Sequence, residues 1–416
     1  MQQQDLIPHL FRTEYRKIAA VLSKWLGIEN LQVAEDLTSE TFLAALENWS
    51  YQGIPANPVA WLYTVAKNKT KNYMARSQLF KQKIEKQIRV NQEHSVADEI
   101  DLSEQNIFDS QLQMLFAICH PAIPTESQVG LALRILCGFG IEEIANAFLT
   151  NKENISKRLQ RAREKLRQEN VKIEFPGKTE IENRLSNVLT TIYLLFNEGY
   201  YSETNDDVLR EDLCFEAMRL TNLLLNFEKT NLPSVNALLS LMCFHASRFE
   251  ARRNDKGELV LYEDQDETKW DQELISKGVY HLKEAAVGEQ ISRYHIEAGI
   301  AYWHTIKADS PEKWESVLHL YNQLLSLEYS PVAALNRTFA LSKVRGKESA
   351  IDEAEKLKLT QNPFYFTLLG ELYTGLNNKK AREYFESALA ITVSQLGQQT
   401  IRKKIEKLDG GLNASP

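Results

Sequence analysis

Apolar residues recur at intervals of three and four along almost the whole chain, and the strict alternation typical of β-strands is nearly absent. Residues 9–26 and 32–49 each carry one apolar stripe of this kind, which predicts two amphipathic helices. One glycine and two prolines in "YQGIPANP" end the second helix. A third helix is expected after Pro58, because proline suits the first helical turn. The pattern therefore predicts an all-α protein.

Two polar stretches divide this helical pattern. Residues 77–110 change from basic to acidic and predict a linker, and "EFPGKTE" (174–180) marks a second boundary. A chain of 416 residues is also too long for one ordinary core, so two or three domains are expected. The predicted divisions are a helical bundle at 1–76, the linker at 77–110, a compact helical unit at 111–173 and a helical extension at 174–416.

The extension contains an internal repeat with a period of 34 residues. Five positions carry it: Leu335, Phe339, Ile351, Ala354 and Leu357 recur as Leu369, Tyr373, Phe385, Ala388 and Ile391. This period resembles that of the tetratricopeptide repeat, in which each repeat is a pair of helices. A series of amphipathic hairpins without a binding role is the alternative, and the pattern does not decide between the two.

Positive charge is concentrated in one short segment of an acidic chain. The sequence has a net charge of −7, yet residues 152–167 hold seven basic residues against two acidic ones. A short helix at 141–148 precedes this segment, and Asn151 or Thr150 can cap the helix that follows. The apolar stripe of that second helix is formed by Ile155, Leu159, Ala162 and Leu166. The pair predicts a helix-turn-helix that binds the DNA major groove, with a merely solvated basic face as the alternative.

A second basic segment carries aromatic and amide side chains as well. Residues 57–76, "NPVAWLYTVAKNKTKNYMAR", contain four basic residues and no acid. Aromatic rings stack on unpaired bases, and asparagine can read base edges, so the segment favours contact with melted DNA. Core packing of Trp61 and Tyr63 is the alternative for these two rings.

Several classes of protein are excluded by what the sequence lacks. No apolar run approaches the roughly 18 residues of a membrane span, and no secretion signal is recognisable at the start. The four cysteines are far apart, which favours reduced thiols in the cytoplasm. No metal-ligand spacing, nucleophile elbow or phosphate loop is present, so we expect no enzyme activity, no catalytic residue and no cofactor. Cys119-His120 and Glu198 are expected to have structural roles.

Two segments resemble an extracytoplasmic-function (ECF) sigma factor of the sigma-70 family. "AEDLTSETFLAALENW" (34–49) followed by the basic segment at 57–76 is similar to region 2, and "LALRILCGFGIEEIANAFLTNKENISKRLQRAREKLR" (131–167) is similar to region 4. Segments such as "VLTTIYLLFNEGYYS" and "SPVAALNRTFAL" resemble the tetratricopeptide-like C-terminal extension of one subgroup. "KNYMARS" departs from the usual Asp-x-x-Arg-Arg of region 2, and Leu149 replaces a common glycine in the helix-turn-helix turn.

The resemblance implies a promoter-specificity subunit that binds bacterial RNA polymerase core and promoter DNA in the cytoplasm, without membrane contact. Region 2 would bind the clamp coiled coil of the largest polymerase subunit through Asp36 and Glu40. The residues implied for the −10 element are Trp61, Lys67, Asn68, Lys69, Lys71, Asn72 and Arg76. The residues implied for the −35 element are Lys152, Asn154, Ser156, Lys157, Arg158, Arg161 and Arg163.

The extension leaves alternatives open. Residues 1–172 hold 21 basic and 20 acidic residues, whereas the remainder holds 28 and 36, so the acidity belongs to the extension. It could contact the sigma regions and cover the basic helices, or it could be required for activity. The alternative functions are a helix-turn-helix regulator that senses a ligand or partner through its repeats, and a scaffold. A regulator would bind duplex DNA tightly without polymerase, whereas a sigma factor would bind it weakly when free.

Overall fold

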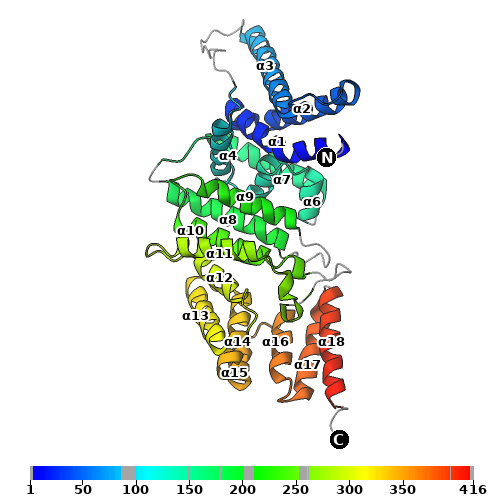
Figure 1. The fold of residues 1–416 in the computed structure, drawn as a ribbon, viewed down its shortest axis with the longest axis vertical. Coiled ribbons are helices and arrows are strands. Elements are labelled where there is room, and N and C mark those ends of the chain that lie inside the picture. Colours follow the sequence, from blue (N-terminus) through cyan, green and yellow to red (C-terminus); the bar gives the residue numbers. More distant parts are fainter. Residues whose placement is uncertain are drawn as a thin grey trace. The chain divides into compact units, whose positions relative to one another are not determined.

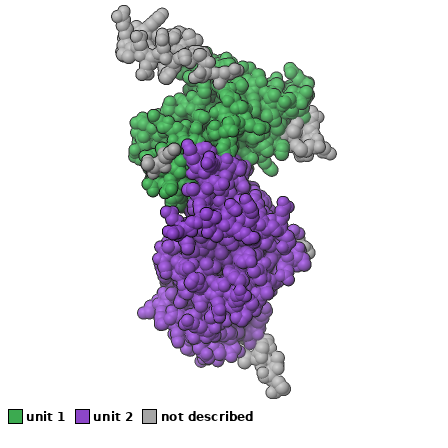
Figure 2. All heavy atoms as spheres, turned by 60° about the vertical axis from the view of Figure 1, so that its left-hand side comes forward, with its two compact units in different colours: residues 1–195 green, residues 196–416 purple. Residues whose placement is uncertain are grey.

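The computed structural model describes residues 3–85, 100–148, 150–177, 180–200, 210–252, 260, 262–393 and 395–412. These residues form helices joined by turns, with no strand among them, as Figure 1 shows. The prediction of an all-α fold is therefore confirmed. By its internal contacts the chain divides into two compact units, residues 1–195 and 196–416, which Figure 2 distinguishes by colour.

The first three helices of the first unit share one hydrophobic core. They are α1 (Gln3–Leu26), α2 (Leu31–Gln52) and α3 (Pro58–Glu85). Tyr15 of α1, Phe42 of α2 and Leu62 of α3 are buried there. The loop between α2 and α3 ends at Asn57, whose side chain accepts a hydrogen bond from the Ala60 amide. The apolar stripes in the sequence therefore predicted the first two helices, and Pro58 predicted the start of the third.

The structure shortens the predicted linker at both ends. Helix α3 continues to Glu85, and α4 (Glu104–Ile118) begins before residue 111, with Ser103 as its N-cap. Ile100, Leu102 and Ile107 are buried in the core of the first three helices. These three apolar side chains explain the difference, because they hold the acidic end of the segment against that core. Residues 86–99, the middle of the predicted linker, lie outside the described residues.

Four short elements follow α4 in the first unit. They are α5 (Thr125–Leu131), a π-helical turn η2 (Ala132–Leu136), α6 (Ile141–Ala147) and α7 (Lys152–Gln168). Asn151 caps α7, since its side-chain oxygen accepts a hydrogen bond from the Asn154 amide. The buried stripe of α7 is the one predicted: Ile155, Leu159, Ala162 and Leu166. Leu149, in the turn before α7, lies outside the described residues.

The first unit ends later than the sequence indicated. Helix α8 (Ile181–Tyr200) begins after "EFPGKTE", yet most of it belongs to the first unit. Arg184 donates a hydrogen bond to the Phe116 carbonyl at 2.7 Å, and the Thr191 hydroxyl donates one to Gln128 at 2.7 Å. The segment between α7 and α8 turns the chain as predicted, but these two hydrogen bonds hold α8 against α4 and α5. The boundary of the unit therefore lies inside α8 rather than at residue 173.

The second unit is a series of helices that pack on their neighbours in the chain. Its first four are α9 (Glu211–Leu225), α10 (Pro233–Ala246), α11 (Gln272–Ala285) and α12 (Arg293–Trp303). The remaining six are α13 (Pro311–Leu327), α14 (Pro331–Arg345), α15 (Lys347–Leu357), α16 (Pro363–Tyr373), α17 (Asn378–Ile391) and α18 (Gln395–Leu412).

The 34-residue period corresponds to two helices of the second unit. Its first copy lies on α14 and α15, and its second copy lies on α16 and α17. Leu335 and its equivalent in the second copy, Leu369, are both buried. The same holds for Ala354 and its equivalent, Ala388. Gly370 packs directly on the Phe385 ring, which a Cβ at that position would overlap at 2.6 Å. The repeated residues thus hold equivalent places in successive helix pairs.

The described residues contain no helix that is both long and apolar enough to cross a membrane. The four cysteines are free and buried, and burial raises the pKa of the Cys119 thiol to about 12. Within the described part of the chain, no three His, Cys, Asp or Glu side chains are grouped as a metal site would need.

Candidate polymerase and nucleic-acid interfaces

Helix α2 presents an exposed face that combines acidic and apolar side chains. Asp36 and Glu40, the predicted polymerase-binding residues, are four positions apart and therefore share one side of the helix. Leu43 and Leu46 continue this surface and are 53% and 48% exposed. Partial burial, and then the neighbouring Glu35 carboxylate, raise the pKa of Asp36. The structure therefore adds both leucines to the candidate surface.

Helix α3 exposes most of the side chains predicted for the −10 element. Asn68, Lys71, Asn72 and Arg76 are exposed, while Lys67 and Lys69 are partly exposed. Asn68 and Asn72 are one helical turn apart and form an amide pair flanked by cations. Lys69 differs from the others because its ammonium lies 3.0 Å from a carboxylate oxygen of Glu40 on α2. The exposed face of α3 can therefore bind an anionic strand and hydrogen-bond to bases.

The aromatic side chains at the start of α3 are held by the core. The Trp61 ring packs edge-to-face on Trp49, with 5.3 Å between the ring centroids. The Tyr63 hydroxyl donates a hydrogen bond to Glu14 Oε2 at 2.7 Å. Burial, together with this hydrogen bond, raises the pKa of Tyr63. Both rings thus have the packing role that the sequence left open, and the partly exposed Trp61 could offer DNA only part of its surface.

The outer face of α7 has two exposed cations that form no ion pair within the described residues, Lys157 and Arg161. Lys152 lies 2.9 Å from Glu142. Arg158 lies 3.3 Å from Glu126 and also above the Phe148 ring. Two further predicted residues are polar: Asn154 is exposed and Ser156 is partly exposed. Lys157 and Arg161 are therefore the side chains most available to a phosphate.

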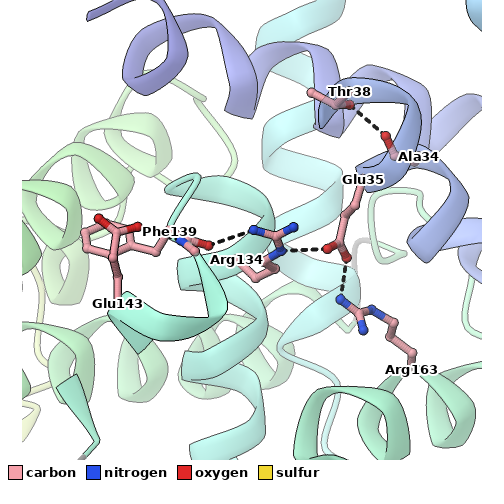
Figure 3. A network of polar contacts seen from close by, with 8 residues as sticks. Ala34, Glu35, Thr38, Arg134, Phe139, Glu143 and Arg163 are labelled. Atoms are coloured by element: carbon pink, nitrogen blue, oxygen red, sulfur yellow. Dashed lines mark hydrogen bonds and ion pairs between the residues drawn. The ribbon is translucent and has the colours of Figure 1, made fainter. Parts of the chain in front are cut away.

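Arg163 is the predicted −35 residue that the structure places elsewhere. Its Nη2 lies 2.5 Å from Glu35 Oε1, and Arg134 Nε lies 2.8 Å from Glu35 Oε2 (Figure 3). The Glu35 side chain is only 4% exposed and each arginine side chain is 17% exposed. Arg163 thus points toward α2 and not outward, where it pairs with a buried carboxylate that would be costly to leave without a partner.

The backbone around Arg134 is shaped to hold this contact. Arg134 lies in the π-helical turn η2, and its Nη1 also donates to the Phe139 carbonyl at 3.0 Å (Figure 3). Gly138 has a φ of 77°, a conformation that favours glycine, and lies against the Tyr15 ring. The Arg134 guanidinium is itself 5.8 Å from the centre of that ring. A lone arginine inside the apolar run "VGLALRILCGFGI" was the available signal that a buried acid would face it.

The comparisons with known proteins agree with the N-terminal geometry. Sigma-70 region 2 matches residues 10–79, which hold the core of α1–α3 and both of their candidate faces. The chain carries a sigma-70 region 2 domain. This domain supports a role in transcription initiation with RNA polymerase core and promoter DNA.

Two further matches concern the remainder of the chain. A family of unknown function, DUF6596, matches residues 184–286. "Uncharacterized protein R00370" of Rhizobium meliloti (strain 1021) is 33% identical over 388 residues, which are 91% of this chain and 90% of that protein. No solved structure is a significant match.

Proposed function

We propose that this chain is a sigma-70 family protein of the ECF type, which directs RNA polymerase core to a limited set of promoters. The observation that carries the proposal is the adjacency of two different surfaces within residues 10–79. The acidic and apolar face of α2 suits a protein partner, because exposed leucines flanked by charges are typical of an interface. The cationic and amide face of α3 suits a nucleic-acid strand.

The α6–α7 pair would bind the −35 element. Its geometry supports this role, since α7 is capped at Asn151, buries one apolar stripe and exposes Lys157 and Arg161. Such a helix can enter the major groove and contact phosphates and guanine edges. Arg158 could join them by exchanging Glu126 for a phosphate, at little cost because this ion pair is exposed.

The extension would modulate this activity through its tetratricopeptide-like helix pairs. Two successive pairs with equivalent buried positions form an array in which each pair is stabilised by its neighbours. A helix-turn-helix regulator that senses a ligand or partner through this array is the competing function.

A pull-down with RNA polymerase core, followed by transcription from a promoter library, tests the proposal. A sigma factor retains core in the pull-down and makes it initiate at a subset of promoters. Folded protein that binds duplex promoter DNA tightly without polymerase, and does not retain core, would establish the regulator instead.

A further inference from the structure

The second unit holds three cationic side chains that form no ion pair with an acid among the described residues. They are Arg248 and Arg252, which follow α10, and Lys313 in the first turn of α13. Arg248 is 8% exposed and Lys313 is 1% exposed, so both of these side chains are buried. A buried cation is normally paired with a carboxylate, because burial removes the water that stabilises its charge.

Asp309 does not neutralise Lys313 in this way. Its carboxylate accepts a hydrogen bond from the Trp314 indole and lies 3.3 Å from the Lys343 ammonium. Asp309 attracts Lys313 only at longer range, and burial still lowers the pKa of Lys313. The Lys313 ammonium instead donates a hydrogen bond to the Ile306 carbonyl at 2.5 Å, which is a neutral acceptor.

Two tyrosine side chains bring the three cations together. Arg248 contacts both of them: its Nη2 donates to the Tyr200 hydroxyl at 3.3 Å, and its Cζ lies 5.4 Å from the centre of the Tyr262 ring. Arg252 Cζ lies 4.1 Å from the centre of the Tyr200 ring. Lys313 Nζ donates to the Tyr262 hydroxyl at 3.2 Å. Cations from the segment after α10 and from the start of α13 therefore converge on one pair of tyrosines.

Neutral rings and hydroxyls offset only part of the cost of burying these charges. Arg248 Nε is buried and has no hydrogen-bond partner in the described part of the chain. Nε and Nη2 lie on the same edge of a guanidinium, and such an edge can bind two oxygens of a carboxylate or a phosphate. Arg252 and Tyr262 are partly exposed, so solvent reaches the group. The arrangement therefore suits an anion that enters from solvent.

We propose that Arg248, Arg252 and Lys313 form a binding site for a small anion with at least two negative charges, carried by phosphate or carboxylate groups. Three cations close together suit such an anion better than a singly charged one, because the attraction grows with each added charge. The bound anion would connect the segment after α10 to the start of α13 and so stabilise the second unit. The site goes beyond the function proposed above and does not depend on it, since none of its residues lies on α2, α3 or α7.

Calorimetric titration of the full chain with inorganic phosphate and, separately, with succinate tests the site. Sodium chloride at equal ionic strength gives the heat of non-specific anion binding. We expect saturable binding of one anion per chain with at least one of the two probes, together with a higher unfolding temperature. The tighter of the two probes shows whether the site recognises phosphate or carboxylate groups. If neither probe binds saturably, the proposal is wrong.

Variants connect the binding to the three cations. Arg248→Lys keeps the charge but loses the edge that binds two oxygens, so it should weaken binding of the tighter probe by at least about tenfold. Arg252→Met removes a charge at a partly exposed position and should also weaken binding, so the test stands even if Arg248→Lys does not fold. Arg345→Met is the matched control, since Arg345 is exposed at the end of α14 and no ion pair joins it to another described residue.

Circular dichroism confirms that each variant is folded before its affinity is compared. The control should bind the anion as the wild type does. Equal affinity of folded Arg252→Met and Arg345→Met would overturn the site, because binding would then not depend on these cations.

Discussion

Glu40 on α2 and Lys69 on α3 form an ion pair, with 3.0 Å between Lys69 Nζ and Glu40 Oε2. The pair joins the surface proposed for polymerase to the surface proposed for the −10 element. Both side chains are partly exposed, so the pair contributes only about 0–1 kcal/mol to the stability of the fold. Its consequence is functional, because one lysine is shared between two binding surfaces.

Replacing Lys69 by Ala should therefore affect polymerase binding in a way that replacing Lys71 does not. Lys69→Ala frees the Glu40 carboxylate for a cation on polymerase, so core affinity should stay equal or rise. Lys71 is exposed, and no ion pair joins it to another described residue, so Lys71→Ala should leave core affinity unchanged. Titration of core with labelled protein gives both affinities. Weaker core binding by Lys69→Ala alone would show that Lys69 positions Glu40 instead.

The two exposed leucines of α2 should act in core binding and not in folding. Leu43→Ala with Leu46→Ala should change the free energy of unfolding by no more than about 0.5 kcal/mol per residue, as exposed positions do. Each should weaken core binding by more than about 1 kcal/mol if it lies at the centre of the interface. Leu376→Ala is the matched control, since Leu376 is 50% exposed in the second unit. Equal core affinity for the control and the double variant would remove the leucines from the surface.

The amide pair of α3 should be needed for opening the promoter and less so for recognising duplex. Asn68→Ala with Asn72→Ala should lower transcription, and a promoter whose −10 segment is already melted should partly restore it. Lys157→Ala, on α7, should not be restored by the same template, because a duplex contact does not depend on melting. Abortive transcript yield on the two templates measures both. The opposite pattern would exchange the tasks assigned to α3 and α7.

The sequence predicted the helices of the first unit well because each buries one continuous stripe. The stripe of α7 and its cap at Asn151 depend on neighbouring residues alone. The boundaries of the linker could not be predicted in this way. Ile100 and Leu102 are ordinary apolar residues in a polar stretch, and only the tertiary structure shows the core that buries them.

The sequence predicted a set of side chains on α7 for the candidate site, but it did not predict the ion pairs that they form within the protein. Arg163 has the same spacing and charge as its neighbours on α7, so a basic helix gives no reason to separate it from them. Its difference comes from Glu35, which is 128 residues away in the chain. Long-range pairing of charges is set by how helices pack, and no local pattern encodes it.

The second unit should lose stability as the pH falls, and His304 should be a main cause. The ring packs edge-on against Tyr262, and burial lowers the pKa of His304 to about 3, helped by the Arg248 and Lys313 charges. In the unfolded chain the pKa is about 6.5, so between these values the unfolded state binds the extra proton. Each pH unit below about 6.5 should therefore lower the free energy of unfolding by up to about 1.4 kcal/mol.

Denaturant unfolding at pH 7 and pH 5 checks this dependence on His304. His304→Gln should reduce the difference between the two pH values, whatever it does to stability at pH 7. His319→Gln is the control, because His319 is exposed on α13. If both variants keep the wild-type difference, protonation of His304 does not govern acid stability.

The role of the extension can be tested by truncation, provided that the shortened protein keeps the whole of the first unit. A cut after residue 173 removes the hydrogen bonds that Arg184 and Thr191 make to Phe116 and Gln128. Each such bond contributes about 0.5–1.5 kcal/mol, so residues 1–173 should melt at a lower temperature than residues 1–195. Thermal unfolding followed by circular dichroism compares the two fragments. Equal melting temperatures would show that α8 does not support the first unit.

Residues 1–195 then provide the fragment for measuring what the extension does to transcription. We expect this fragment to be less active than the full chain at equal folded concentration with saturating core, which is the result that a required extension predicts. The acidic charge of the extension makes the opposite result physically reasonable, since it could cover the basic helices. Greater activity of the fragment would establish inhibition. Equal activity would reject both mechanisms and leave the helix pairs as a binding site for another partner.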